Sequence, residues 1–332
     1  MPKIVGVSFG TKNGNNDTVC KAVLLAAQEA GCEVEFIRAM DLDIKHCTGC
    51  ITCVKMLMSG TKNMCVHKDD FDWLAFELFH ADGVVMVDPI FETGVTGLFH
   101  TIMDRFGPRM DTGNNFISTQ IAKGRLAEGG PAAKGVEVPD PVIMSPKAVS
   151  YIGIGGSDWG THVQSEHQLQ AMTPSWKVID NDWVPWSKTA LMDDSLMERA
   201  AQIGKNLAEA AAKIQENVAA GADPYEGVEY KGEEGICSHC HCNDFYLVPG
   251  ENRAICCVCG LEGELSIVDG AVKVTYKPED LHKAHDILSG KEIHGKDIQE
   301  NEGKLAEMKK TQAYKDRVNF YKEAIKATAP QK

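Results

Sequence analysis

The segment that most constrains this chain lies at its start, where a short apolar run leads into a polar loop and then a helix. Residues 4–7 form the apolar run, which predicts a buried strand. Apolar residues recur at helical spacing from about Asp17 or Thr18 onward, and Gly31 follows as a stop signal. A strand, a loop and a helix in this order favour an α/β fold with a parallel sheet.

The loop between this strand and this helix is suited to binding a phosphate. Unpaired backbone N–H groups at a helix N-terminus point at one spot and favour an anion there. The loop matches neither GxGxxG nor GxxxxGK[ST], which argues against a dinucleotide fingerprint and a P-loop. A single terminal phosphate, as in FMN, fits better, and a capped turn that binds nothing is the alternative. Uncharged donors are available from Ser8, Thr11, Asn15, Asn16 and Thr18.

Apolar runs and helical patterns continue to alternate up to about residue 220. Further strands are predicted at residues 32–37, 84–87, 148–152 and 176–184, with helices between them. Polar, glycine-containing loops follow the first, third and fourth strands. We therefore expect a flavodoxin-like, doubly wound parallel sheet of five strands, with the three loops meeting outside the carboxyl ends of the strands.

Residues 111–146 interrupt this alternation. They follow a helix predicted over residues 94–106, they are rich in Gly, Pro, Asn and Ser, and only a short helical piece is predicted within them, at about residues 120–126. A connection of this length inside an α/β unit is typical of a lid or an interface arm. We expect this insertion to supply much of a substrate pocket.

The pattern divides the chain into four parts. We predict a flavodoxin-like FMN-binding domain over residues 1–220, which includes the insertion, and a linker over residues 221–236. A small, strand-like, zinc-ribbon-like module is predicted over residues 237–276, and a polar helical tail over residues 277–332. The module and the tail would serve for dimerisation, for covering the flavin or for docking a partner, and we expect a homo-oligomer.

Charge and composition limit the partners and the compartment. The net charge of −13 argues against a nucleic-acid surface over the whole protein. No apolar run approaches the ~20 residues that a membrane span requires. Met1 leads directly into the first strand without a charged and apolar leader, so we expect a cytoplasmic protein, in which the 12 cysteines are metal ligands or redox groups and not disulfides.

The first cysteine cluster has the spacing of an iron–sulfur site. Three thiols at two-residue spacing, followed by a later fourth, can wrap a small inorganic core, as in the Cys₄ ligation of a [4Fe–4S] cluster. Zinc and a cysteine-rich turn with free thiols are the alternatives. The four residues are Cys47, Cys50, Cys53 and Cys65.

The second cysteine cluster predicts a mononuclear metal site. Two CxxC units, each on a turn between short strands, bring four thiolates into a tetrahedron, for which Zn is the expected ion and rubredoxin-like Fe the rival. Cys242 and Cys257 are spare and can exchange with a neighbour as ligand. A module of this size buries little apolar area, so the metal is expected to stabilise it. The four expected ligands are Cys237, Cys240, Cys256 and Cys259.

Several motifs together resemble one known family. The phosphate loop, the CTGCITC run, Asp82-Gly83 before the third strand, and Pro89-Ile90-Phe91 leading to Met103-Asp104-Arg105 look like the NAD(P)H-dependent FMN reductase family, iron–sulfur flavoprotein branch. The similarity covers about residues 1–215. Two departures are Thr11, where the family often has Arg, and a longer gap between Cys53 and Cys65.

The resemblance implies a set of FMN-binding residues. The phosphate would be held by Ser8, Thr11, Asn16 and Thr18, and Cys47, Cys50, Cys53 and Cys65 would hold the cluster. The isoalloxazine and ribityl would lie along Pro89, Ile90, Phe91, Glu92 and Thr93, with Gly155, Gly156 and Asp158 on the other side.

These features predict an FMN-dependent oxidoreductase. It would pass electrons from NAD(P)H or a protein donor to a small-molecule acceptor or an electron carrier, with the [4Fe–4S] cluster as a candidate relay. The flavin carries the chemistry, so no catalytic side chain is predicted. The alternatives are a redox-sensing binding protein that uses the zinc module to contact a partner or nucleic acid, and a pure electron-transfer flavoprotein.

Overall fold

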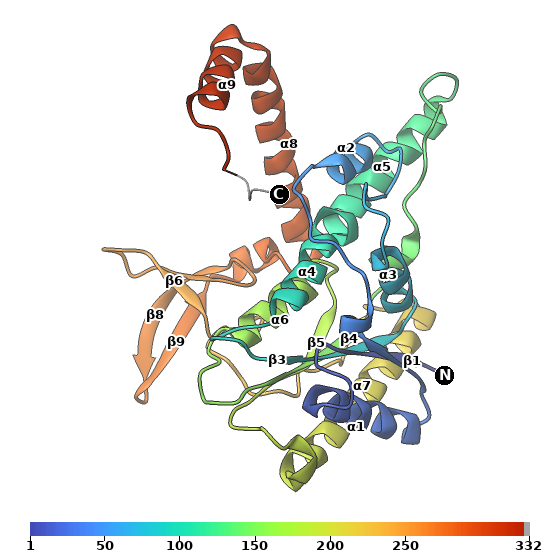
Figure 1. Cartoon of the computed structure of the whole chain (residues 1–332), viewed down its shortest axis with the longest axis vertical. Coiled ribbons are helices and arrows are strands. Elements are labelled where there is room, and N and C mark those ends of the chain that lie inside the picture. Colours follow the sequence, from blue (N-terminus) through green and yellow to red (C-terminus); the bar gives the residue numbers. More distant parts are fainter. Residues whose placement is uncertain (329–332) are drawn as a thin grey trace. The chain divides into compact units, whose positions relative to one another are not determined.

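The computed structural model describes residues 1–328 (Figure 1). The chain forms two compact units, Met1–Lys291 and Glu292–Lys332. The first unit contains the parallel sheet and the cysteine-rich module, and the second contains most of the helical tail. Each unit is described by itself.

The first unit is built on a sheet of five parallel strands in the order β2-β1-β3-β4-β5. The order places β1 between β2 and β3, so the chain reverses its winding direction at β1. This confirms the flavodoxin-like, doubly wound sheet that the sequence predicts. The strands are β1 (Lys3–Ser8), β2 (Glu33–Arg38), β3 (Gly83–Pro89), β4 (Ala148–Ile154) and β5 (Lys177–Val184).

Helices cover both faces of this sheet (Figure 1). On one face, α1 (Asn15–Glu29) and α7 (Asp194–Ala220) bury Val23, Leu24, Ile203 and Leu207. The two helices approach closely at Gly204, where an added Cβ would lie 2.2 Å from the carbonyl oxygen of Val23. The other face is covered mainly by α3 (Phe71–Phe79), α4 (Gly97–Met110) and α6 (Val163–Met172).

Two segments on this second face differ from the sequence prediction. The helix predicted over residues 94–106 is α4, which runs on to Met110 across a kink at Gly107. The helix predicted at residues 120–126 is present but longer, because α5 is a helix of 17 residues, Thr112–Glu128. Its polar and β-branched residues have modest helix propensity, whereas the Asp111 carboxylate caps its first turn and it packs against α2 (Thr52–Met58).

The cysteine-rich module forms an antiparallel sheet in the order β6-β7-β8-β9. Its strands are β6 (Phe245–Leu247), β7 (Ala254–Cys256), β8 (Glu262–Val268) and β9 (Ala271–Tyr276). Its small core contains Val258, Leu261 and four cysteines, which are Cys237, Cys242, Cys256 and Cys259. Short 3₁₀ helices elsewhere are Ala39–Asp41, Pro141–Met144, Ala190–Met192 and Pro278–Lys283.

The tail is helical. Helix α8 (Leu288–Lys310) begins in the first unit and continues into the second, where α9 (Gln312–Ala324) follows. Apolar residues of α9, including Val318 and Tyr321, are exposed. Among residues 1–328, no helix combines the length and the apolar character that crossing a membrane requires.

Candidate flavin site and cysteine-rich metal centre

The strand register brings the predicted flavin loops to one edge of the sheet. Ser8 pairs with Val87, and Pro89 pairs with Ile154. Backbone hydrogen bonds continue past the strand ends, from Phe9 N to Val87 O at 2.9 Å and from Ile90 N to Ile154 O at 3.0 Å. The loops after β1, β3 and β4 therefore lie side by side, as the sequence predicts.

The N-terminus of α1 leaves donors free for an anion. Gly14 is the N-cap, and no side chain caps the helix. The N–H groups of Asn15, Asn16 and Asp17 precede the first intrahelical bond, which Thr18 N makes to Gly14 O. The Asn16 amide Nδ2 is buried without a hydrogen-bond partner, although buried donors are normally paired. This orphaned donor beside a helix N-terminus fits a phosphate oxygen.

Buried polar contacts fix the shape of the loop. An added Cβ at Gly10 would lie 2.7 Å from Asn16 Cβ, so glycine permits the close approach. Ser8 Oγ donates to Asp17 Oδ1 at 2.6 Å, and Arg38 Nη2 donates to Asp17 Oδ2 at 2.7 Å. Burial raises the pKa of Asp17, but the bonds from Arg38, Ser8 and the Asn13 backbone outweigh it and lower this pKa.

Two predicted phosphate residues contact other parts of the chain or the loop itself. Asn15 Nδ2 donates to Ser187 O at 3.4 Å, and Asn15 Oδ1 accepts from Ala190 N at 3.2 Å. Thr18 Oγ1 donates to Gly14 O at 3.0 Å, while Thr11 is exposed. The Asn15 contacts bring the segment after β5 to the phosphate loop, where Ser187 Oγ is a second buried atom without a partner. Sequence reasoning missed Ser187, because no local pattern marks it.

The loop after β3 is a tight turn held from outside by α6. Phe91 and Gly94 exchange backbone hydrogen bonds, and Glu92 between them has a φ of 53°. Val95 N donates to Glu166 Oε2 at 2.6 Å. His162 N donates to Thr93 O at 2.9 Å. The predicted residues Pro89 to Thr93 thus follow a fixed path along the sheet edge.

A buried polar chain that the sequence does not reveal lies under this loop. His167 Nε2 lies 2.7 Å from Asp88 Oδ1, and His167 Nδ1 lies 2.9 Å from Asn181 Oδ1. Asp88 Oδ2 accepts from Thr96 N at 3.4 Å, at the end of the loop. Both His167 and Asp88 are fully buried. These hydrogen bonds connect β3, α6 and β5, so they hold the loop against the sheet.

The loop after β4 completes the edge. Gly155 N donates to Val184 O at 2.8 Å, and Ser187 N donates to Gly155 O at 2.9 Å. An added Cβ at Gly155 would lie 3.0 Å from Ser157 O, so the turn is compact. Gly156 and Asp158 are exposed next to it.

Three large aromatic side chains stand out from these loops. Phe91 after β3, Trp159 after β4 and Trp186 after β5 are 65%, 59% and 65% exposed. Gly160 packs against Ile90, which brings the first two loops together. The edge of the sheet is therefore lined by exposed aromatic rings as well as by polar donors.

The first cysteine cluster lies on an exposed segment. A buried ion pair holds the two ends of this segment together. Asp69 Oδ2 and Arg105 Nη1 lie 2.5 Å apart, and each side chain is 1% exposed. Arg105 also donates to Lys45 O at 2.8 Å, so both ends of the segment are held. Burial raises the pKa of Asp69, but hydrogen bonds from Arg105 and from the Lys45 and Phe71 backbones lower it to about 2.

The cysteines of this segment differ in environment. Burial raises the pKa of Cys53; the nearby thiols of Cys65 and Cys47 raise it further, and Arg109 opposes them. Cys50 is exposed, and hydrogen bonds from Thr52 lower its pKa. Cys53 therefore lies within electrostatic reach of Cys65, Cys47 and Arg109, but the four predicted ligands do not form a compact group of metal-ligating atoms among residues 1–328.

The second cluster forms a compact group, here called the cysteine quartet: Cys237, Cys240, Cys256 and Cys259. All four Sγ atoms lie within 4.8 Å of one another, and no other such group of metal-ligating side chains occurs among residues 1–328. Sγ distances are 3.5 Å from Cys240 to Cys237 and to Cys256. The hydrogen bond from the Cys240 thiol lowers the pKa of Cys237. Four sulfurs at one point, three of them on buried cysteines, fit a single tetrahedral metal ion.

The spare cysteines lie beside the quartet without joining it. Cys242 is buried, and its sulfur lies 3.5 Å from Asp244 O. Cys257 is exposed. None of the 12 cysteines forms a disulfide in this structure.

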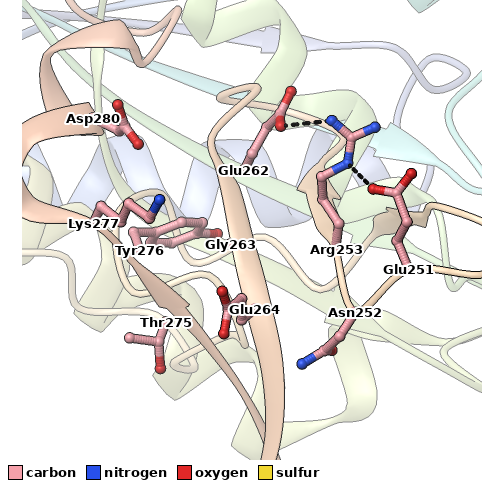
Figure 2. A pocket seen from close by; sticks show the side chains of 10 residues that line it. All are labelled: Glu251, Asn252, Arg253, Glu262, Gly263, Glu264, Thr275, Tyr276, Lys277 and Asp280. Carbon is pink, nitrogen blue, oxygen red and sulfur yellow. Dashed lines mark hydrogen bonds and ion pairs between the residues drawn. The ribbon is translucent and has the colours of Figure 1, made fainter.

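A cavity of about 660 Å³ on the module is lined by charged side chains (Figure 2). Arg253 contacts Glu251 and Glu262, each at 3.1 Å, and Tyr276 supplies one aromatic wall. Asp280, another lining residue, pairs with Lys283 outside the cavity at 2.7 Å. This cavity lies on the module sheet and not at the carboxyl edge of the parallel sheet, so it is separate from the flavin site.

Fold and site together define a class of protein. A flavodoxin-like sheet with uncapped helix donors, an orphaned buried amide and three converging loops is the architecture of a protein that binds a mononucleotide cofactor. The sequence profile of the family described as NADPH-dependent FMN reductase matches residues 2–190, more than half of the chain. The chain therefore belongs to this family, and it is an FMN-dependent oxidoreductase.

The individual relatives are iron–sulfur flavoproteins on the one hand and proteins named for flavones on the other. An iron–sulfur flavoprotein of Archaeoglobus fulgidus is 33% identical over 107 residues, 32% of this chain and 46% of that protein, so the match spans about half of that relative. A flavone synthase, cfoJ, of Aspergillus candidus is 22% identical over 279 residues, 80% of this chain and 79% of that protein. A solved structure of a flavone reductase is 45% identical with a TM-score of 0.83, over 99% of this chain and 100% of that one.

Proposed function

We propose that this protein takes electrons from NAD(P)H and passes them through FMN to a small planar acceptor of the flavone type. The observation that carries this proposal is the 45% identity with a flavone reductase across 99% of the chain, module and tail included. The exposed aromatic rings of Phe91, Trp159 and Trp186 support it, since such rings stack well on a planar conjugated molecule.

The residues divide between holding FMN and holding the loop. We propose that the phosphate is bound by the first N–H groups of α1 and by Asn16 Nδ2, with Thr11 at the mouth of the loop. Ser8, Asn15 and Thr18 support the loop through the hydrogen bonds described above. The ring system is placed along Pro89, Ile90, Phe91, Glu92 and Thr93 and beside Gly155, Gly156 and Asp158.

FMN, when bound, supplies the ability to accept and release a hydride. Reducing a carbon–carbon double bond conjugated to a ketone needs a hydride on the carbon distant from the carbonyl and a proton on the neighbouring one. The contribution of this chain is to orient the ring and the acceptor against each other. The fixed loop Pro89 to Thr93 and the aromatic rim are the parts suited to that task.

The test is anaerobic turnover with purified, FMN-loaded protein. NADPH or NADH oxidation is followed with a flavone, a quinone or a nitroaromatic compound as acceptor, oxygen is tested in a separate aerated sample, and products are analysed by mass spectrometry. We expect the flavone to gain two hydrogen atoms and to support the fastest oxidation. Oxidation of NAD(P)H with an unchanged flavone would reject the flavone-type acceptor but retain the reductase.

The same assay separates the other function classes. Reduction by a ferredoxin but not by NAD(P)H would indicate an electron-transfer flavoprotein. Absence of turnover with every acceptor, together with redox-dependent binding to a partner, would indicate a sensor.

We also propose a [4Fe–4S] cluster on Cys47, Cys50, Cys53 and Cys65. Support comes from the iron–sulfur flavoproteins among the relatives and from the nearby cation Arg109, which offsets thiolate charge. Iron and sulfide would be quantified in anaerobically purified protein. We expect the Cys50→Ser variant to lose iron and the matched Cys20→Ser variant, at a buried core position, to keep it. Iron-free wild-type protein would leave these cysteines as free thiols.

At the cysteine quartet we propose Zn, with Fe as the rival, and we propose that residues 237–276 fold around it as a module. Metal analysis distinguishes the two ions.

We further propose that the protein is a homo-oligomer, because the exposed apolar residues Val318, Phe320 and Tyr321 of α9 can be covered by a second copy. Light scattering with a Phe320→Glu variant tests this, and a monomeric wild type would contradict it.

A further inference from the structure

The first turn of α6 contacts the flavin loop on one side and the cysteine-rich module on the other. On the flavin side, His162 N donates to Thr93 O at 2.9 Å and Glu166 Oε2 accepts from Val95 N at 2.6 Å. An added Cβ at Gly94 would lie 2.2 Å from Glu166 Oε2. This turn of helix therefore fixes the position of the loop that faces the flavin ring.

On the module side, one carboxylate contacts the same turn. Asp244 Oδ2 accepts a hydrogen bond from Ser165 Oγ and lies 3.2 Å from His162 Nδ1. Ser165 is 8% exposed and the Asp244 side chain is 26% exposed, so the bond between them is partly buried. A hydrogen bond to a charged group is stronger than one between neutral groups, and leaving a buried partner unpaired is costly.

The position of Asp244 depends in turn on the cysteine quartet. Asp244 O accepts from Cys257 N at 3.0 Å, and Cys257 follows Cys256 of the quartet. Asp244 N donates to Cys242 Sγ at 3.2 Å. Phe245, the next residue, pairs with Cys256 between β6 and β7. A metal that fixes Cys256 therefore also fixes the backbone that presents the Asp244 carboxylate.

We propose that Asp244 is a positioning residue that couples metal occupancy of the cysteine quartet to FMN affinity through the first turn of α6. The proposal rests on the FMN site proposed above. Loss of the metal frees Asp244, loosens the turn at His162 and Ser165, and removes support from the flavin loop. Because coupling between two sites is reciprocal, bound FMN must also tighten metal binding by the same factor.

The first experiment measures FMN binding to Asp244→Ala and Asp244→Asn by flavin fluorescence, with the metal content of each variant determined in parallel. We expect Asp244→Ala to keep its metal and to bind FMN about tenfold more weakly, a typical size for coupling between sites. Asn retains an acceptor oxygen, so Asp244→Asn should recover part of the affinity.

The matched control is Gln168→Ala, which also removes a contact between α6 and the module. Gln168 Nε2 donates to Cys240 O at 2.8 Å, one turn further along the helix and away from the flavin loop. We expect wild-type FMN affinity in this control. Equal FMN affinity in wild type and Asp244→Ala, or equal losses in Asp244→Ala and Gln168→Ala, would overturn the proposal.

The second experiment needs no variant. Release of Zn²⁺ from the metal-loaded wild-type protein to a chromogenic chelator is measured with and without saturating FMN. We expect FMN to slow the release and to tighten the Zn²⁺ affinity, determined at equilibrium against the chelator, by about the factor found for FMN binding. Identical release in both samples would overturn the coupling while leaving the FMN site in place, whereas wild-type protein that binds no FMN would overturn both.

Discussion

Asp69 allows the fold around the first cysteine cluster to be tested quantitatively. Replacing Asp69 by Asn preserves the shape of the side chain but leaves the buried Arg105 guanidinium without its anionic partner. A pKa that falls from 3.8 to about 2 corresponds to about 2.4 kcal/mol, at about 1.4 kcal/mol per pH unit. Unpairing a buried charge typically costs about 3–5 kcal/mol. We therefore expect Asp69→Asn to lower the free energy of unfolding by about 3 kcal/mol at pH 7.

The matched control is Asp72→Asn, which breaks the neighbouring ion pair to Arg109. The Asp72 side chain is 62% exposed, and an exposed pair contributes at most about 1 kcal/mol. Urea unfolding followed by tryptophan fluorescence measures both variants. Equal destabilisation by the two substitutions would refute the distinction between the buried and the exposed pair.

The pH dependence of the same variant follows from the lowered pKa of Asp69. A carboxyl group with a depressed folded-state pKa stabilises the protein above its ordinary pKa of 3.8, and this contribution is lost as the pH falls toward 2. The difference between wild type and Asp69→Asn should be constant from pH 7 to about 5 and should narrow below about pH 4. A difference that is unchanged at pH 3 would contradict the proposed ionisation.

Three further substitutions address the flavin site and the metal centre. Asn16→Ala should weaken FMN binding about tenfold in a fluorescence titration, since it removes a hydrogen bond to a charged group, whereas Gln28→Ala, at the exposed end of the same helix, should not. Gly94→Ala forces Glu166 away from the loop and should weaken FMN binding, whereas Gly97→Ala meets no atom within 4 Å and should not. Cys240→Ala should release the metal and make the module sensitive to proteolysis, while FMN still binds at saturating concentration; a protease-resistant, metal-free module would contradict metal-dependent folding.

Local patterns predict part of this molecule well. The apolar run of β1, the polar loop and the start of α1 follow from the first residues of the chain. The quartet follows from the spacing of two CxxC units, because turns between short strands present the thiols in a fixed way. Both features depend on residues that are close in sequence.

Other features depend on contacts between distant segments and have no local signal. Asp88, His167 and Asn181 come from three different elements, and their pairing appears only when the sheet is assembled. Asp244 and Ser165 belong to the module and to α6, and no spacing rule relates them. Helix α5 is longer than its propensity indicates, because capping and packing against α2 extend it.

The central claim is that three loops at one edge of a parallel sheet bind FMN by its phosphate and its ring. The most direct measurement is a parallel titration of the apoprotein with FMN and with riboflavin, followed by anaerobic addition of NADPH. We predict an equimolar FMN complex, much weaker binding of riboflavin because it lacks the phosphate, and bleaching of the bound flavin by NADPH. Failure to bind FMN, or equal affinity for FMN and riboflavin, would contradict the account.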